Sequence, residues 1–252
     1  VLLDVVVGGD CRQLMTITAS TTMFDTLQRN YGTLQEKVAA ACAASGRPAD
    51  SVTVVAVVKY AEIDWVRGLM ELGVRDLGES RPQQLLERSA PLGDDVRWHL
   101  IGHLQRNKIR KILPLTTLIH SIDSWKLLRA VDRVAEELNL KPQLLLQVNV
   151  SGEESKGGFE PAALKQTWET VATFQHVEVR GLMTMAPASR DLGEARETFA
   201  RLRMLRDELA AGGPPEISLP DLSMGMSGDF EVAIAEGATL VRIGSSRFEG
   251  RS

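Results

Sequence analysis

The sequence predicts an α/β fold, a (β/α)8 barrel of the TIM type preceded by an N-terminal helix. Short apolar runs alternate with amphipathic segments along most of the chain, which is the pattern of a parallel sheet with crossover helices. Eight such units follow the leading helix, whereas an open doubly wound sheet usually has fewer units and needs edge strands. No linker or repeat divides the chain, so we expect a single domain.

The composition favours a globular protein that acts on small molecules. The 252 residues are 44% hydrophobic and 25% charged, which suits one large domain or two small ones. A net charge of −4 argues against generic binding to nucleic acid or to acidic membranes. The two cysteines, Cys11 and Cys42, provide neither a disulfide framework nor a metal cluster, so a reducing cytoplasm is the expected compartment.

The N-terminal segment is expected to lie outside the folded domain. Residues 1–22 are interpreted as an extension that need not be ordered, and residues 23–252 as the barrel domain. The apolar opening contains Asp4 and lacks a basic flank, so it makes a poor signal peptide or membrane span. A leading helix is predicted over residues 24–44.

The expected strands are short runs dominated by Val, Ile and Leu. They cover residues 53–58, 76–78, 98–102, 118–122, 144–150, 178–183, 217–222 and 239–243. Between them, apolar residues recur at helical spacing, as from Leu127 to Leu138, and glycines such as Gly73 and Gly212 end helices. Pro114 ends a helix that begins near Asn107. We interpret these stripes as core and assign them no chemistry.

Lys59 ends the most apolar of these strands. A lysine is rarely buried unless it is paired or chemically employed, because desolvation penalises its charge and lowers its pKa. The neutral amine that results is a nucleophile towards carbonyl carbon. The alternative is a solvated lysine just past a strand end, which has no chemical role. The other strand ends decide between the two.

The C-terminal ends of the expected strands gather polar and glycine residues. A barrel builds its active site from the loops at these ends. The residues are Lys59, Glu79, Ser80, Gly102, His103, Asp123, Asn149, the methionines of 183–185, and the segments 224–228 and 242–246. The last two segments matter most, because barrels often bind phosphate with the loops after their seventh and eighth strands.

Ser227 and Gly244 are the candidate phosphate ligands. Ser227 and Gly228 directly precede the helical run 230–236, so the hydroxyl and nearby backbone N–H groups face the positive end of a helix. Gly244 and Ser245 are expected to form the other wall. An ordinary N-cap explains Ser227 equally well by itself, and a tight turn explains Gly244. Their joint occurrence opposite Lys59 favours a phosphate site.

A phosphate site that faces an amine indicates a ligand with a phosphate and an aldehyde, such as pyridoxal 5′-phosphate. Lys59 would hold it as an internal aldimine. Arg242 is expected to reach the pyridine nitrogen, the alternative being a salt bridge with Glu79 or Asp123. An arginine there disfavours protonation of that nitrogen and weakens the cofactor as an electron sink.

A series of motifs, in order along the expected strands, carries a family resemblance. They are Ala56-Val57-Val58-Lys59, Leu77-Gly78-Glu79, Trp98-His99-Leu100-Ile101-Gly102-His103-Leu104-Gln105 with Asn107-Lys108, Val148-Asn149-Val150-Ser151, Lys156-Gly157-Gly158, Arg180-Gly181-Leu182-Met183, Leu222-Ser223-Met224-Gly225-Met226-Ser227 and Val241-Arg242-Ile243-Gly244. From about residue 27 to 250 the chain resembles the pyridoxal-phosphate homeostasis proteins, single-domain relatives of the alanine racemase N-terminal barrel.

The resemblance implies the roles of individual residues. Lys59 would carry the cofactor as a Schiff base, Ser227, Gly244 and Ser245 would contact its phosphate, and Arg242 would approach the pyridine nitrogen. It also implies buffering or delivery of the cofactor without turnover, with apo pyridoxal-phosphate enzymes as candidate recipients. Two residues depart from the family pattern: Ser80 stands for the usual asparagine, which leaves any ring contact there open, and Ser245 for a common threonine.

The rival interpretation is a pyridoxal-phosphate enzyme such as an amino-acid racemase. Two-base racemization needs a second proton-transfer group opposite the lysine, and alanine racemases recruit a tyrosine from a further domain across a dimer. Tyr31 and Tyr60 are the only tyrosines, and Tyr60 is expected on the opposite strand face from Lys59. We expect no such further domain and therefore a monomer. A barrel enzyme that uses Lys59 for a sugar Schiff base is a third reading.

Two other clusters are assigned no chemistry. His99 and His103 lack the cysteine or carboxylate partners of a metal site, and His99 is expected inside the barrel. The basic run 106–111 is interpreted as a solvated face, with a partner surface as the alternative.

Overall fold

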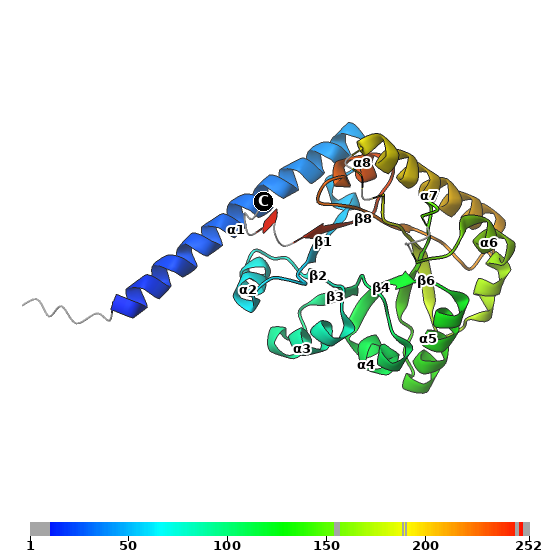
Figure 1. Ribbon diagram of the computed structural model, residues 1–252, viewed down its shortest axis with the longest axis horizontal. Coiled ribbons are helices and arrows are strands. Elements are labelled where there is room, and N and C mark those ends of the chain that lie inside the picture. The colour runs from blue at the N-terminus through cyan, green and yellow to red at the C-terminus, as the bar shows by residue number, and fades with distance from the viewer. Residues whose placement is uncertain (1–10, 154–156, 188, 190, 245–246, 249–252) are drawn as a thin grey trace, which may run out of the picture.

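The chain folds into a closed barrel of parallel strands, as predicted. The computed structural model describes residues 11–153, 157–187, 189, 191–244 and 247–248, with side chains from residue 22 onward. In this part of the chain eight strands pair in the order β1 to β8, and β8 pairs with β1 to close the barrel. Helices cover the outside of the barrel (Figure 1).

Strands and helices alternate along the chain from β1 onward. The strands are β1 Thr53–Val57, β2 Asp76–Glu79, β3 Arg97–Leu100, β4 Thr116–Ile122, β5 Gln143–Gln147, β6 Glu178–Met183, β7 Asp221–Met226 and β8 Leu240–Gly244. The helices are α1 Cys11–Ala44, α2 Ile63–Glu71, α3 Pro82–Leu92, α4 Ile109–Ile112, α5 Trp125–Leu138, α6 Pro161–Gln166, α7 Leu192–Gly212 and α8 Phe230–Ala235. Short 3-10 turns are η1 Ala49–Ser51, η2 Arg106–Lys108, η3 Leu113–Leu115 and η4 Trp168–Thr173.

Helix α1 is longer than the predicted 24–44 and extends past the barrel (Figure 1). Its second half packs against α8 and α2 through a buried stripe at helical spacing, made by Leu27, Leu34, Val38 and Cys42. Of the expected N-terminal extension, residues 1–10 lie outside the described residues. No helix in the described part of the chain is long and apolar enough to cross a membrane.

The apolar core has two layers because parallel strands of a barrel are buried on both faces. One layer lies between the strands and the surrounding helices. The other fills part of the barrel interior and consists of Val55, Leu118, Leu145, Met183 and Leu240. The rest of the interior holds polar side chains, which are described below.

Strand β7 is the element that the sequence misplaced. The prediction was 217–222, whereas the strand runs from Asp221 to Met226. Pro220 lacks the backbone N–H that a central strand must donate, so pairing begins after it. The segment Met224-Gly225-Met226 therefore belongs to the strand itself, and Ser227 follows it directly. The other strands lie within three residues of their predicted ends.

Gly225 is the position in β7 that tolerates no side chain. Its φ is +90°, and an added Cβ would lie 2.5 Å from the Cβ of Ala233 in α8. We therefore expect G225A to lower the free energy of unfolding by about 2–5 kcal/mol, through backbone strain and overpacking together. Urea denaturation measures this difference.

The matched control is G32A in α1. An added Cβ at Gly32 meets nothing within 4 Å, and its φ is not positive. We expect G32A to be neutral or to stabilise by about 0.5–1 kcal/mol, because alanine is the better helix former. Equal effects of the two substitutions would contradict the packing argument.

Candidate functional site

The main candidate site is a cavity at the C-terminal mouth of the barrel. Its volume is about 870 Å³, which lies within the usual range for ligand pockets. It is lined by Val57, Lys59, Tyr60, Ser80, Ile101, Gly102, His103, Asp123, Gln147, Gly157, Met185, Met226, Ser227, Gly228, Arg242 and Gly244. Among the predicted site residues, Lys59, Ser227, Arg242 and Gly244 meet around this cavity. Ser245 lies outside the described residues.

Lys59 reaches the cavity from a turn rather than from a strand. Strand β1 ends at Val57, and Lys59 is half-buried instead of fully enclosed. Its ammonium nitrogen lies 5.0 Å from the ring centre of Tyr60, within the range of a cation–π contact. In the part of the chain that the structure describes, Lys59 forms no ion pair. The amine is thus available to a ligand in the cavity.

Tyr60 corrects the expectation that it would point away from Lys59. That expectation extended strand alternation past Val58, whereas the chain leaves the strand and turns, so both side chains line the cavity. Tyr60 is 70% exposed at the rim. Sequence alternation carries no information once a strand has ended, and no other feature of the sequence marks this residue.

The segment that follows β7 forms the wall opposite Lys59. The Oγ atom of Ser227 accepts a hydrogen bond from the backbone N–H of Gly244 at 3.1 Å. This bond joins the ends of β7 and β8, and both residues line the cavity. The Ser227 hydroxyl retains its own proton to donate into the cavity, so Ser227 and Gly244 stay candidate phosphate ligands on one wall.

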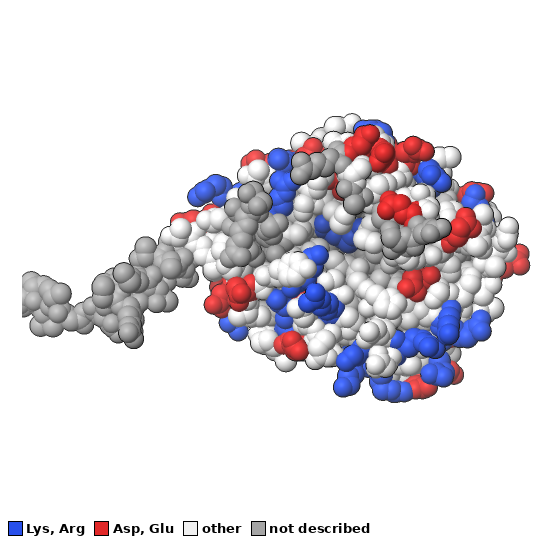
Figure 2. Space-filling view, viewed as in Figure 1, with Lys and Arg blue, Asp and Glu red and all other residues white. Residues whose placement is uncertain are grey.

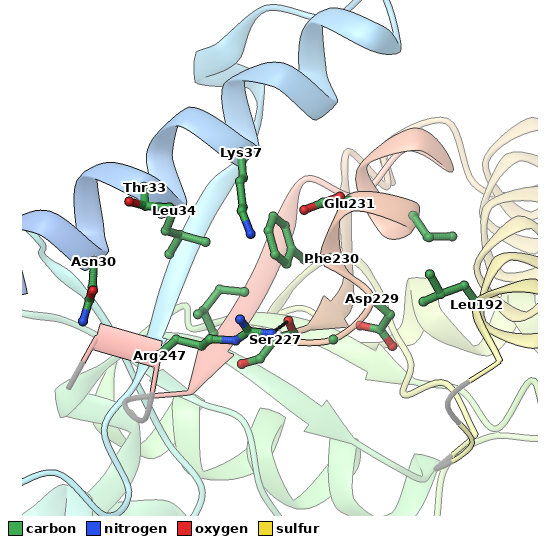
Figure 3. Close-up of a pocket in the computed structure, with 13 residues that line it drawn as sticks. Asn30, Thr33, Leu34, Lys37, Leu192, Ser227, Asp229, Phe230, Glu231 and Arg247 are labelled. Carbon is green, nitrogen blue, oxygen red and sulfur yellow. Dashed lines mark hydrogen bonds between the residues drawn. The ribbon is translucent and has the colours of Figure 1, made fainter. Parts of the chain in front are cut away.

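Helix α1 supports this wall from outside the barrel. A second, smaller pocket of about 300 Å³ lies behind Ser227, between α1 and α8 (Figure 3). Arg247 donates to the carbonyl of Ser227 at 3.0 Å, and Asn30 of α1 donates to the carbonyl of Phe248 at 2.9 Å. The C-terminal segment therefore connects α1 to the candidate phosphate site.

Arg242 lies at the floor of the cavity and is 4% exposed. Its Nη1 donates to Ser223 Oγ at 2.5 Å, and its Nη2 donates to the carbonyl of Thr184 at 2.8 Å. Burial lowers the pKa of the guanidinium to about 10, and the charge of Asp229 opposes this shift. Among the described side chains, no carboxylate forms an ion pair with Arg242.

The salt bridges considered as an alternative for Arg242 are not formed. Glu79 lies 3.1 Å from the Nε atom of Arg88, and the carboxylate of Asp123 lies 3.2 Å from Nδ1 of His103. Both carboxylates therefore have other partners. Arg242 is a buried cation held by two neutral acceptors, with its remaining donors next to the cavity.

The remaining strand-end residues divide into two groups. Ser80, His103 and Asp123 line the cavity as expected. Asn149 does not, because its Oδ1 accepts from Gly152 N and holds the following loop. Sequence reasoning missed Ile101 and Gln147, which lie at the ends of β3 and β5, and Gly157 in the loop after β5, because no polar pattern marks them.

His99 lies inside the barrel, as predicted, and is 3% exposed. It contacts His120 and Asp76 rather than the cavity. In the described ranges, no group of three or more His, Cys, Asp or Glu side chains is arranged to hold a metal ion.

The basic run 106–111 is part of a larger basic surface. Lys and Arg side chains gather over α4 and α5 in Figure 2. A shallow groove there is lined by Arg106, Lys126, Arg129 and Arg133. Arg110 pairs with Glu137 of α5, so acidic side chains neutralise part of the surface. This is consistent with the predicted solvated face.

The fold and the cavity define a class of protein. The alanine racemase N-terminal domain family matches residues 24–251, so the chain belongs to it. The alanine racemase of Clostridium difficile shares this fold with a TM-score of 0.68 at 12% identity, over 87% of this chain and 55% of that one.

Closer relatives identify the family within that class. The chain is 40% identical over 217 residues to the pyridoxal phosphate homeostasis protein of Aquifex aeolicus, covering 86% of this chain and 94% of the relative. PipY of Synechococcus elongatus, solved with pyridoxal phosphate bound, is 38% identical with a TM-score of 0.76, and the match covers 85% of this chain and 99% of PipY. The chain belongs to the pyridoxal phosphate homeostasis protein family.

The Glu79–Arg88 pair, next in sequence to the cavity residue Ser80, gives a pH-dependent prediction. Glu79 is fully buried, and burial raises the pKa of its carboxyl, whereas the charge of Arg88 lowers it. We expect R88M to destabilise by about 3–5 kcal/mol at neutral pH, because it leaves a buried carboxylate without a counter-charge.

The sign of the pH dependence follows from the raised pKa. As the pH falls, the folded variant binds a proton at Glu79 before the unfolded chain does, so the destabilisation of R88M should shrink at about pH 5. Urea denaturation at both pH values measures it. The double variant E79Q/R88M should lose this pH dependence, and an equal deficit of R88M at both pH values would contradict the argument.

Proposed function

We propose that this protein binds pyridoxal 5′-phosphate as a Schiff base with Lys59 and acts in the buffering or delivery of the cofactor without catalytic turnover. One observation carries the proposal. A single cavity brings together an unpaired amine, a hydroxyl beside a backbone N–H, and a buried guanidinium, which match the aldehyde, phosphate and ring nitrogen of this cofactor.

The covalent bond would form at the amine of Lys59. Its Nζ lone pair attacks the aldehyde carbon, a C=N bond forms, and the carbonyl oxygen leaves as water. The reverse reaction consumes water and frees the aldehyde. Tyr60 at the rim is 70% exposed, so water reaches this part of the site and release by hydrolysis is accessible. A reversible bond of this kind suits a carrier.

Arg242 favours holding the cofactor over using it. A guanidinium that donates to the pyridine nitrogen requires that nitrogen to be an acceptor, hence unprotonated. The unprotonated ring withdraws electrons less strongly, so it stabilises a substrate carbanion less. Two neutral acceptors hold Arg242 in its buried position, and its free donors lie next to the cavity.

A second candidate function is a racemase or related enzyme. Its support is Tyr60, which lines the same cavity as Lys59. However, Tyr60 lies beside the amine, whereas two-base racemization needs a group on the opposite side of the bound substrate. Tyr31 packs against Phe248 outside the barrel, with ring centres 6.3 Å apart.

The proposal also covers the recipients of the cofactor, the oligomeric state and the cellular compartment. Apo pyridoxal-phosphate enzymes are the expected recipients. The protein is proposed to act as a monomer. Its compartment is the cytoplasm, because the buried free thiol of Cys42 suits a reducing environment.

The cofactor assignment predicts a visible absorption band. The wild-type protein loaded with pyridoxal phosphate should be coloured, and borohydride should bleach it and leave the cofactor attached by mass. K59A should lose both properties. The matched control is K37A, because Lys37 lines only the smaller pocket behind Ser227. A colourless wild-type protein that cannot be reconstituted would overturn the assignment.

The absence of turnover predicts that substrate protons are retained. The loaded protein, incubated with a panel of L- and D-amino acids in deuterated water, should exchange no α-proton on the time scale of a working enzyme. Proton NMR of the amino acids measures this. Rapid exchange of any amino acid would support the racemase reading, and its loss in Y60F would assign the second base to Tyr60.

A further inference from the structure

A chain of hydrogen bonds crosses the barrel interior and ends at Arg242. Arg242 Nη1 lies 2.5 Å from Ser223 Oγ, which lies 2.8 Å from Nδ1 of His120. Nε2 of His120 lies 2.9 Å from Nδ1 of His99, and Nε2 of His99 lies 3.0 Å from Asp76 Oδ1. Five side chains from five different strands thus form one continuous chain.

The hydrogen-bond chain runs along the barrel from the N-terminal ends of the strands to the mouth. Asp76 is the first residue of β2, whereas Arg242 is the middle residue of β8 and lines the cavity. His120 on β4 and Ser223 on β7 are not on neighbouring strands, so their contact must pass through the interior. His99, His120 and Ser223 are buried, whereas Asp76 is partly exposed and pairs with Arg97.

The ionised carboxylate of Asp76 determines the direction of the first bond, and the tautomers of His99 and His120 carry that direction to Ser223. Although burial opposes it, hydrogen bonds from Arg97 and His99 hold the pKa of Asp76 well below its usual range, so it only accepts. His99 must therefore donate from Nε2. If this is the only ring proton of His99, its Nδ1 accepts, and His120 donates to it from Nε2.

The same logic extends to Arg242. Burial, together with the charge of Arg242, holds the pKa of His120 well below its usual value, so this imidazole is neutral. Its Nδ1 therefore accepts the single proton of the Ser223 hydroxyl. The Ser223 oxygen is left with its lone pairs towards Arg242, which it anchors as a pure acceptor.

We propose that Asp76, acting through His99, His120 and Ser223, positions the Arg242 guanidinium for the ring of the bound ligand from the far end of the barrel. The four residues are positioning residues, since none of them lines the cavity. If the direction of the chain were reversed, His120 would donate to Ser223, and the serine proton would compete with the Nη1 proton of Arg242.

The ligand part of this inference rests on the proposed function, whereas the directions of the hydrogen bonds do not. The protein has only four histidines, so their ring nitrogens are resolvable by ¹⁵N NMR of the protein without cofactor. We expect both His99 and His120 to be neutral and to carry the proton on Nε2. A proton on Nδ1 of His120 in the wild-type protein would overturn the proposal without any variant.

A matched pair of substitutions tests the far end. D76N replaces the pure acceptor by an amide that also donates, so both directions of the chain become accessible. R97Q removes the neighbouring ion pair but keeps the carboxylate, and Arg97 is 55% exposed. We expect D76N to move the ring resonances of His120 as well as His99, and R97Q to leave His120 unchanged. Unchanged His120 resonances in D76N would contradict the proposal.

The ligand arm uses pyridoxal phosphate itself. D76N and S223A should shift the visible absorption maximum of the loaded protein and weaken cofactor affinity by about 3–10-fold, the loss expected for one hydrogen bond. R97Q should match the wild type. T198V, which removes a buried hydroxyl in α7 away from the chain, controls for a general loss of packing.

The outcomes separate the two proposals. Wild-type protein that does not bind the cofactor would overturn the proposed function, while the NMR arm would still test the chain. Wild-type binding with an unchanged spectrum and affinity in both D76N and S223A would overturn the positioning role.

Discussion

The pairing of the first strand with the last is the constraint on which the rest of the structure depends. β1 and β8 come from opposite ends of the domain, and their register sets Val55 beside Arg242 and Val57 beside Gly244. Lys59 follows the end of β1, so closure of the barrel brings its amine to the guanidinium and to the segment after β7. In an open sheet the same two strands need not be neighbours, and the Lys59 amine, the Arg242 guanidinium and the segment after β7 would not line one cavity. The site is a consequence of closure.

Closure also creates an interior that side chains must fill. Here an apolar cluster shares it with a polar hydrogen-bond chain, and this chain ends at a buried guanidinium that forms no ion pair with a described carboxylate. Burying such a charge costs free energy, which two neutral acceptors offset only in part. Donors left next to the cavity favour a ligand that supplies an acceptor there. Because such a ligand binds the folded state alone, it would also raise the stability of the barrel.

The barrel by itself does not distinguish a carrier from an enzyme, since related barrels occur in alanine racemases. The arrangement around the cavity does favour one. In the proposed binding mode, an arginine rather than a carboxylate faces the ring nitrogen, the rim is exposed, and the tyrosine in the cavity lies on the same side as the lysine. Each of these features makes reversible binding easier than carbanion chemistry, which needs an electron sink, exclusion of water and two opposed proton-transfer groups.

The sequence alone determined the barrel and most of the residues around its mouth, among them Lys59, Ser227, Arg242 and Gly244. Strand periodicity is a local property of the sequence, and it locates the strand ends. Because barrels carry their active sites at the C-terminal strand ends, these positions then predict the site. The tertiary structure decided the rest. Pro220 delays the start of β7, so this strand lies nearer the C-terminus than predicted. Strand β1 ends at Val57, so Tyr60 lies in a turn and lines the cavity. The contacts of Arg242 with Thr184 and of His120 with Ser223 join strands that are not consecutive in sequence. Such contacts depend on how the barrel closes, and no local pattern encodes them.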